Sequence, residues 1–265
     1  MRRKITMNKK FQNYAETIQT LNLSLISDTA SLPKSLLIDA VGDLSIYYVP
    51  FDYINQDAKI VIVGITPGFT QLKNALIAAQ SNIGLGKTVE ETLIDIKKKA
   101  SFSGAMRKNL VDMLDFVGIE KWLGISSCAD LFSTQSHLLH STSALKYPVF
   151  IKGENYNGTP NMTKHPLLKS YLLANFGKEA EMLKNAIFVP LGPKPAEAMQ
   201  LLVKNGVVDE SRILFGMPHP SPASMERINY FLEKKEKSKL SIKTNPDLID
   251  NAKQAIIDKL KSLNA

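Results

Sequence analysis

Two short segments carry the residue types that could do chemistry. Residues 64–68, GITPG, combine two glycines with the hydroxyl of Thr66, and glycine lets a ligand approach the backbone closely. Residues 218–224, PHPSPAS, hold His219 in a loop stiffened by proline, with two serines close to the start of a predicted helix. Each segment alone is also consistent with a tight turn and a structural histidine. Together they predict a ligand site.

Three other patterns could also indicate a functional site, but a structural role explains each of them better. Residues 81–88, SNIGLGKT, end like a phosphate-binding loop but follow a helical pattern and lack its first glycine, so a phosphotransferase is disfavoured. The histidines, His137, His140 and His165, lack thiols or a clear third ligand nearby, and surface or loop positions explain them better than a metal site. Cys128 is interpreted as a small core residue.

The elements that must position the two segments alternate between strand and helix patterns. Strands are predicted at residues 58–65, 125–132, 186–191 and 212–215, and the first segment directly follows the first of them. Helices are predicted at residues 71–79, 89–99, 105–116, 171–184, 196–204, 223–234 and 245–263, and Thr88 and Glu91 have the spacing of a capping box before the second of them. This order predicts an α/β fold, a three-layer α/β/α sandwich with a four-stranded parallel sheet, whose ligands gather at the carboxyl ends of the strands. The Gly-, Asn- and Pro-rich residues 146–166 are predicted to form a long loop.

Composition limits the class of protein. Of 265 residues, 44% are hydrophobic and 22% charged, which is typical of one folded domain. We expect residues 1–235 to form this domain with an N-terminal helical extension, and residues 236–265 to supply a linker and an amphipathic helix packed on it. The single cysteine and the lack of an apolar stretch of about 20 residues predict a cytoplasmic chain that binds no membrane. The net charge of +8 favours polyanionic partners.

At these two segments the chain resembles the uracil-DNA glycosylase superfamily. The resemblance rests on residues 64–68, on residues 219–222, HPSP, and on residues 189–192, VPLG, between them. It covers roughly residues 58–231. It implies hydrolysis of the N-glycosidic bond of a base in DNA, as in base-excision repair, without a metal or organic cofactor. His219 would donate a hydrogen bond to the departing base, and Thr66 would position water.

Three departures from the family pattern bear on activity. Thr66 stands where more active branches carry Asp or Asn, and a threonine hydroxyl cannot act as a base near neutral pH. Ala223 stands where members wedge a large apolar side chain into DNA, although Met225 could substitute for it. Residues 125–130 lack the asparagine that often recognises the base. The alternative to a glycosylase is therefore a catalytically weak or inactive nucleic-acid or nucleotide-binding protein.

The resemblance also implies contact positions. Substrate would lie against Gly64, Ile65, Pro67, Gly68 and Phe69, and Tyr48 and Phe51 could stack on a base, although such aromatic residues more often belong to a core. DNA would meet Gly192, Lys194, Ser221, Ala223 and Ser224. We expect a monomer that prefers single-stranded DNA, or else binds a nucleotide or base.

Overall fold

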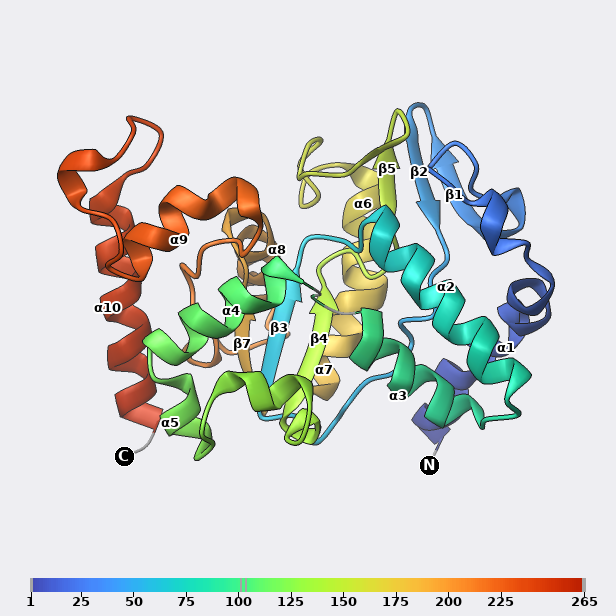
Figure 1. The fold of residues 1–265 in the computed structure, drawn as a ribbon, viewed down its shortest axis with the longest axis horizontal. Coiled ribbons are helices and arrows are strands. Elements are labelled where there is room, and N and C mark those ends of the chain that lie inside the picture. The colour runs from blue at the N-terminus through green and yellow to red at the C-terminus, as the bar shows by residue number, and fades with distance from the viewer. Residues whose placement is uncertain (1, 101, 103, 264–265) are drawn as a thin grey trace. The chain divides into compact units, whose positions relative to one another are not determined.

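The computed structural model describes residues 2–100, 102 and 104–263 (Figure 1). The chain divides into two compact units. Unit 1 comprises Met1–Ile54, Ile65–Ser101 and Thr142–Phe176, and unit 2 comprises Asn55–Gly64, Phe102–Ser141 and Gly177–Ala265. Among the described residues, no helix has both the length and the apolar character that crossing a membrane requires.

Unit 1 contains a four-stranded sheet in the order β1-β2-β5-β6, with antiparallel neighbours. Two-residue turns close its hairpins: Gly42 has a φ of 58°, and Lys152 and Gly153 have φ values of 51° and 77°, the left-handed region that tight hairpins need. The strands are β1 (Leu37–Val41), β2 (Leu44–Tyr47), β5 (Val149–Ile151) and β6 (Glu154–Asn155). Its helices are α1 (Arg2–Thr20), α2 (Phe69–Gly84), α3 (Val89–Ala100) and α6 (Pro166–Tyr171).

This hairpin sheet was not predicted from the sequence. Residues 146–166 were expected to form a loop, yet they contain β5 and β6. The strands are two to five residues long, which is too short for a period-two pattern to stand out. The helix at 89–99 was predicted, and its capping box is present: Thr88 N–H donates to the Glu91 carboxylate (2.9 Å), and Glu91 N–H donates to the Thr88 hydroxyl (3.2 Å).

Unit 2 is built on a sheet in the order β4-β3-β7, although the last two residues of β4 belong to unit 1. The strands are β4 (Leu139–Ser143), β3 (Ile60–Gly64) and β7 (Ile187–Pro190). β3 and β7 pair in parallel from Ile60↔Ile187 to Val63↔Pro190, and all residues of both strands are buried. The strands predicted at 58–65 and 186–191 are therefore confirmed as parallel strands, with β3 in the middle of the sheet and β7 at its end.

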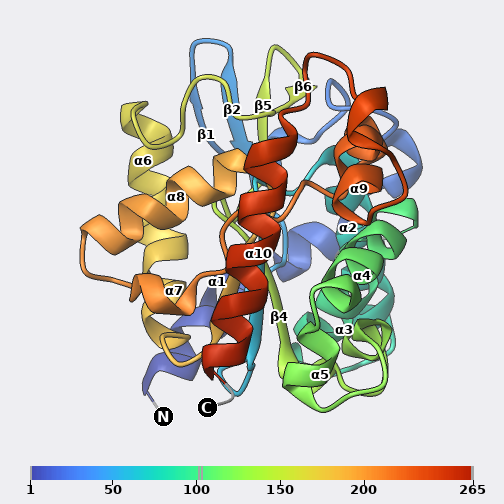
Figure 2. The same cartoon turned by 90° about the vertical axis from the view of Figure 1, so that its left-hand side faces the viewer.

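Helices cover both faces of this sheet. Ile60, Ile62 and Val189 pack in one cluster with side chains of α4, α9 and α10, such as Leu110 and Phe231. α8 contacts β7 and lies on the opposite side of β4 from α4 (Figure 2), and α9 packs against α10. The helices are α4 (Ala105–Phe116), α5 (Ile119–Leu123), α7 (Lys178–Met182), α8 (Pro193–Lys204), α9 (Met225–Phe231) and α10 (Pro246–Leu263), and a π-helical segment, Leu172–Gly177, joins α6 to α7.

The predicted four-stranded parallel sheet is wrong, because the segment at 212–215 makes only an isolated parallel bridge between Phe188 and Ile213. One further bond, from Leu214 N–H to the Phe188 carbonyl (2.8 Å), continues it. A 3₁₀ turn, Glu210–Arg212, ends just before the bridge, and Gly216 turns the chain away with a φ of 99°. Since Ala252 of α10 lies where a Cβ on Gly216 would stand, α10 takes the place next to this short edge.

The strand predicted at 125–132 is also wrong. Residues Cys128–Phe132 form a 3₁₀ helix. The Asp115 carboxylate accepts hydrogen bonds from the Ser127 hydroxyl (2.7 Å) and Cys128 N–H (2.6 Å), which fixes its start. Cys128 and Leu131, three residues apart, are both fully buried, and this is the spacing of a 3₁₀ turn rather than a strand. The strand beside β3 is β4, about ten residues further on.

Candidate functional site

The loop after β3 is held by the hydroxyl of Thr66. This hydroxyl donates to the carbonyl of Tyr147 (3.0 Å) and accepts from Val149 N–H (3.2 Å), at the start of β5. A threonine hydroxyl has one donor and two lone pairs, so one lone pair remains. Thr66 therefore ties residues 65–68 to β5 and keeps one position that can accept a hydrogen bond from water.

The start of α2 lies against β6. Phe69 N–H donates to Oδ1 of Asn155 (2.8 Å), and Gly68 N–H donates to Oε1 of Gln71 (3.0 Å). A Cβ on Gly68 would stand 3.3 Å from Oδ1 of Asn155, so glycine allows this close approach. The β5–β6 hairpin thus supports the loop at both Thr66 and Phe69.

The second segment places His219 in unit 2 beside the turn after β7. Gly192, with a φ of 84°, donates its N–H to the Met217 carbonyl (2.8 Å), and a Cβ there would stand 3.3 Å from Cβ of His219. Nδ1 of His219 accepts a hydrogen bond from Ser221 N–H (3.3 Å). Burial lowers the pKa of His219 below its ordinary value. The ring is therefore neutral near pH 7, with its proton on Nε2.

A buried asparagine from α4 clamps this loop. Nδ2 of Asn109 donates to the carbonyl of Pro220 (2.9 Å) and contacts Sδ of Met225 (3.3 Å). Asn109 is 9% exposed, so both contacts are shielded from water. The half-buried Met225 also packs against the core cluster, which makes it unsuited to the wedge role that the sequence left open for it. A polar residue on the apolar face of a predicted helix is the signal that could have identified Asn109.

The predicted DNA-contacting positions lie on one short stretch and one helix start. Ala223 is exposed in a single 3₁₀ turn, Pro222–Ser224, and α9 begins only after it. Ser224 N–H donates to the Ser221 carbonyl (2.9 Å), inside the turn. Lys194, in the first turn of α8, pairs with Glu197 (2.8 Å). Pro222 and Ala223 are the exposed residues of this stretch, whereas Ser221 and Ser224 are half-buried.

The aromatic residues proposed to stack on a base divide into two groups. Tyr48 is fully buried, stacks on Tyr14 with ring centroids 3.9 Å apart, and donates to Asp52 (2.6 Å). Phe51 is 6% exposed. Both rings therefore lie in the core of unit 1, the alternative that the sequence left open. Phe69, at the start of α2, is half-buried.

His140, His165 and Cys128 have structural surroundings, but the surface or loop position expected for His140 is wrong, because it lies buried on β4. Nε2 of His140 lies 2.8 Å from Oε1 of Glu179, with both side chains buried, and its Nδ1 accepts from Asn55 N–H (3.3 Å). His165 caps the start of α6. Cys128 is fully buried, and burial raises the pKa of its thiol, which opposes nucleophilic reactivity. Residues 85–88 form the turn between α2 and α3.

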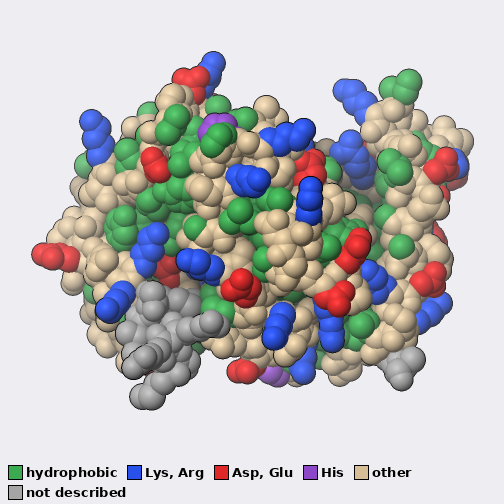
Figure 3. Space-filling model, turned by 180° about the vertical axis from the view of Figure 1, so that it is seen from behind, with side chains coloured by type: hydrophobic (Ala, Val, Ile, Leu, Met, Phe, Trp, Pro, Cys, Tyr) green, Lys and Arg blue, Asp and Glu red, His purple; other side chains and the backbone are tan. Residues whose placement is uncertain are grey.

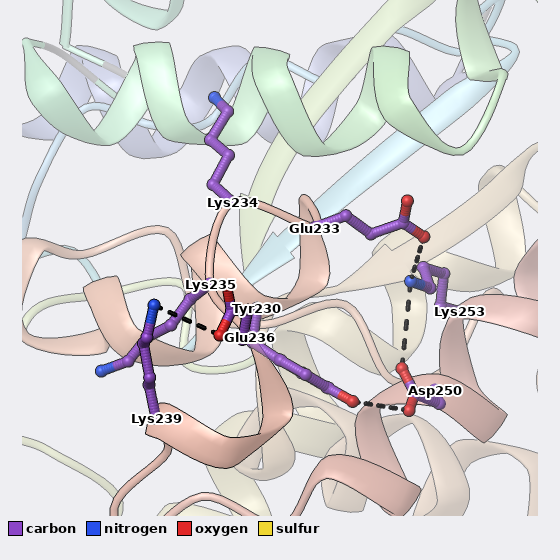
Figure 4. A pocket seen from close by; sticks show the side chains of 8 residues that line it. All are labelled: Tyr230, Glu233, Lys234, Lys235, Glu236, Lys239, Asp250 and Lys253. Carbon is purple, nitrogen blue, oxygen red and sulfur yellow. Dashed lines mark hydrogen bonds and ion pairs between the residues drawn. The ribbon is translucent and has the colours of Figure 1, made fainter.

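A charged pocket of about 450 Å³ lies in unit 2 where α9 ends (Figure 4). Its lysines are matched by acids: Lys253 pairs with Glu233 (2.9 Å), Lys239 pairs with Glu236 (3.2 Å), and Lys234 reaches toward Asp112 of α4 (3.7 Å). This pairing leaves little positive charge for an anionic ligand. Basic and acidic side chains are likewise interspersed on the face seen in Figure 3. Among residues 2–100, 102 and 104–263, no three His, Cys, Asp or Glu side chains are grouped to hold a metal ion.

The structure thus brings the predicted site residues together in two sets. Thr66, Gly68 and Phe69 meet the β5–β6 hairpin in unit 1. Gly192, His219 and the residues that follow it meet α4 in unit 2. Sequence reasoning missed Asn155 and Asn109. The end of β4 carries Ser141, Thr142 and Ser143, so it has no asparagine either.

Comparison with known proteins adds independent information. The model of the family described as "Uracil DNA glycosylase superfamily" matches residues 51–248. A Bacillus subtilis (strain 168) protein named "Uncharacterized protein YoxB" is 38% identical over 245 residues, covering 91% of this chain and 95% of that protein. No solved structure matches the chain.

Proposed function

Because the chain belongs to the uracil DNA glycosylase superfamily, we propose that it hydrolyses the N-glycosidic bond of a deaminated base in DNA. In this reaction the bond between C1′ and the base nitrogen breaks, and its electron pair leaves with the base. Water supplies a hydroxyl to C1′, and its proton neutralises the base. The sugar becomes cation-like and the base anionic in the transition state, so a donor aimed at the base stabilises it.

The observation that carries the proposal is the environment of His219. Ser221 N–H can only donate, so Nδ1 of His219 must accept, and the neutral ring then carries its proton on Nε2. A neutral Nε2–H is a suitable donor to a carbonyl oxygen on which negative charge develops. Gly192 and Asn109 support this role, because they fix the backbone on either side of the ring.

Thr66 takes the water-positioning role in this proposal through its remaining lone pair. Its proton is committed to the Tyr147 carbonyl, so it can orient water only by accepting. It has no basic function near neutral pH. This chemistry predicts slow excision, because the water must attack C1′ of the sugar without a carboxylate to take its proton.

DNA is the proposed partner, in single-stranded form. The net charge of +8 favours a polyanion, and the exposed Ala223 is too small to fill the gap left by an extruded base. Extrusion from a duplex costs a few kcal/mol, whereas a single strand avoids most of that cost.

The test is excision from defined substrates. Single-stranded and duplex oligonucleotides carrying uracil, hypoxanthine or xanthine are incubated with the protein, and abasic sites are revealed by alkaline cleavage. We expect cleavage of at least one single-stranded substrate by the wild type and its loss in His219→Ala. No cleavage of any of the six substrates by folded protein contradicts the proposal.

A binding protein without catalysis is the second candidate, and the contacts of Thr66 favour it. Two backbone groups hold its hydroxyl, so the loop can be kept in shape for ligand binding alone. Base-dependent binding of single-stranded DNA without any excision would identify this function.

A further inference from the structure

We propose that the side-chain amide of Asn155 reads the base, by donating a hydrogen bond from Nδ2 to an exocyclic carbonyl oxygen. The inference rests on the proposed function, since it places the base at the loop after β3. It names a specificity-determining residue that lies outside residues 64–68 and 218–224.

The orientation of this amide is fixed by its partner. Phe69 N–H can only donate, so the Asn155 atom 2.8 Å from it must be Oδ1. The Nδ2 amino group therefore points away from Phe69. Within the described part of the chain it makes no hydrogen bond, and the side chain is exposed. Two donors are thus held in a known direction beside Gly68.

The strand that carries Asn155 is well anchored. Asn155 pairs with Phe150 across the β5–β6 hairpin, and Tyr156 N–H donates to the Val149 carbonyl (3.1 Å). At the hairpin turn, the Thr29 hydroxyl donates to the Gly153 carbonyl. Because Val149 also contacts Thr66, one hairpin positions both the water-orienting hydroxyl and the amide. A donor that is fixed before binding loses little entropy on contact.

Local charge favours a base carbonyl over a backbone phosphate as the acceptor. The one lysine in residues 149–155, Lys152, lies 3.6 Å from the Asp43 carboxylate. Glu154 adds an exposed carboxylate next to Asn155. A neutral amide in such surroundings attracts a carbonyl oxygen more than an anionic phosphate.

Asn155→Asp separates this role from a structural one. The carboxylate keeps an oxygen for Phe69 N–H and suits a helix start, so the melting temperature should not fall. The donor, however, becomes an acceptor. Lys152→Asn is the matched control, because it lowers the charge of the same hairpin by one and asparagine tolerates the φ of 51°.

The readout is equilibrium binding, which does not require excision. The probes are single strands containing 2′-fluoro-2′-deoxyuridine, which resists cleavage, or a tetrahydrofuran abasic analogue. We expect wild type and Lys152→Asn to bind the uracil strand more tightly than the abasic strand. Asn155→Asp should lower the ratio of these two affinities about tenfold. A wild-type ratio of one, an unchanged ratio in Asn155→Asp, or equal weakening of both probes overturns the inference. If base-dependent binding persists while no substrate is excised, only the proposed function fails.

Discussion

Ser221 N–H donates a hydrogen bond to Nδ1 of His219 at 3.3 Å. This contact makes Nε2 the protonated nitrogen of the neutral ring, and the proposed function assigns this donor to the departing base. Removing that donor by His219→Ala should lower excision of the best substrate by about 10² to 10³-fold. Single-turnover cleavage of an oligonucleotide measures the effect. Undiminished cleavage would show that His219 is structural.

The Ser221 contact itself can be deleted with proline. Ser221 has a φ of −66°, which matches the φ of proline, and proline has no N–H. Ser221→Pro should therefore lower excision more than Ser221→Ala, which removes only the hydroxyl. Equal excision rates for the two variants, at equal folded fraction, would mean that Ser221 N–H does not determine which nitrogen of the His219 ring carries the proton.

Stability should depend on pH through His219. Burial lowers the pKa of the folded-state ring below its ordinary value of 6.5, so below that pH the unfolded chain binds more protons, and the free energy of unfolding rises with pH. The contribution of the neutral His219 ring to the free energy of unfolding is complete above pH 6.5 and is lost as the pH falls through the lowered pKa. We expect the difference in unfolding free energy between wild type and His219→Asn to increase from about pH 5 to pH 7. A difference that stays flat over this range would contradict a neutral, half-buried ring.

Asn109 should act as a positioning residue for the His219 loop. Asn109→Leu keeps the volume but leaves the buried Pro220 carbonyl without its donor, which should cost about 1–3 kcal/mol of stability and lower excision. The matched control is Asn82→Leu, because Asn82 is a buried asparagine of unit 1 that donates to Asp95 (2.8 Å). Chemical denaturation and single-turnover rates of folded protein distinguish the two. Equal rate losses in both variants would reduce Asn109 to a general stabilising role.

Thr66 offers a graded series. Thr66→Val removes the hydroxyl and leaves the Tyr147 carbonyl and Val149 N–H without their partner, at a cost of about 1–3 kcal/mol. Thr66→Asn can replace both contacts, because its amide both donates and accepts, and we expect it to raise excision. Thr66→Asp sets a carboxylate against the Tyr147 carbonyl, so we expect a smaller gain or none. If Thr66→Asp excises faster than Thr66→Asn, the water does not lie where the contacts of the Thr66 hydroxyl put it.

Ala223 should control the preference for single strands. If residues 221–224 meet DNA, binding should weaken steeply with salt as phosphates release counterions. Ala223→Leu supplies apolar volume at the exposed turn and should improve duplex binding or excision relative to single strands. Fluorescence anisotropy across a salt titration measures both. A preference that Ala223→Leu leaves unchanged would exclude this turn from the DNA contact.

Local patterns in the sequence determined strands β3 and β7 and the start of α3. The β-branched runs around Ile62 and Val189 have to be buried on both faces, and this requirement alone identifies β3 and β7. Thr88 and Glu91 define the start of α3 through bonds three residues apart. Residues 64–68 and 218–224 were also identified from local sequence, because each is a short turn that directly follows or precedes a predicted strand or helix.

Tertiary structure decided what the local patterns could not contain. The contact of Asn155 with Phe69 joins residues 86 positions apart, and that of Asn109 with Pro220 joins residues 111 positions apart. The segment around Ile213 has strand-like residues, yet α10 packs at Gly216 and confines it to a single bridge. The sequence by itself therefore determined strands β3 and β7 and singled out Thr66 and His219 as candidate site residues. Only the tertiary structure decided the protonated nitrogen of His219, the contacts of the Thr66 hydroxyl and the direction of the Asn155 amide, because each depends on a partner that folding brings close.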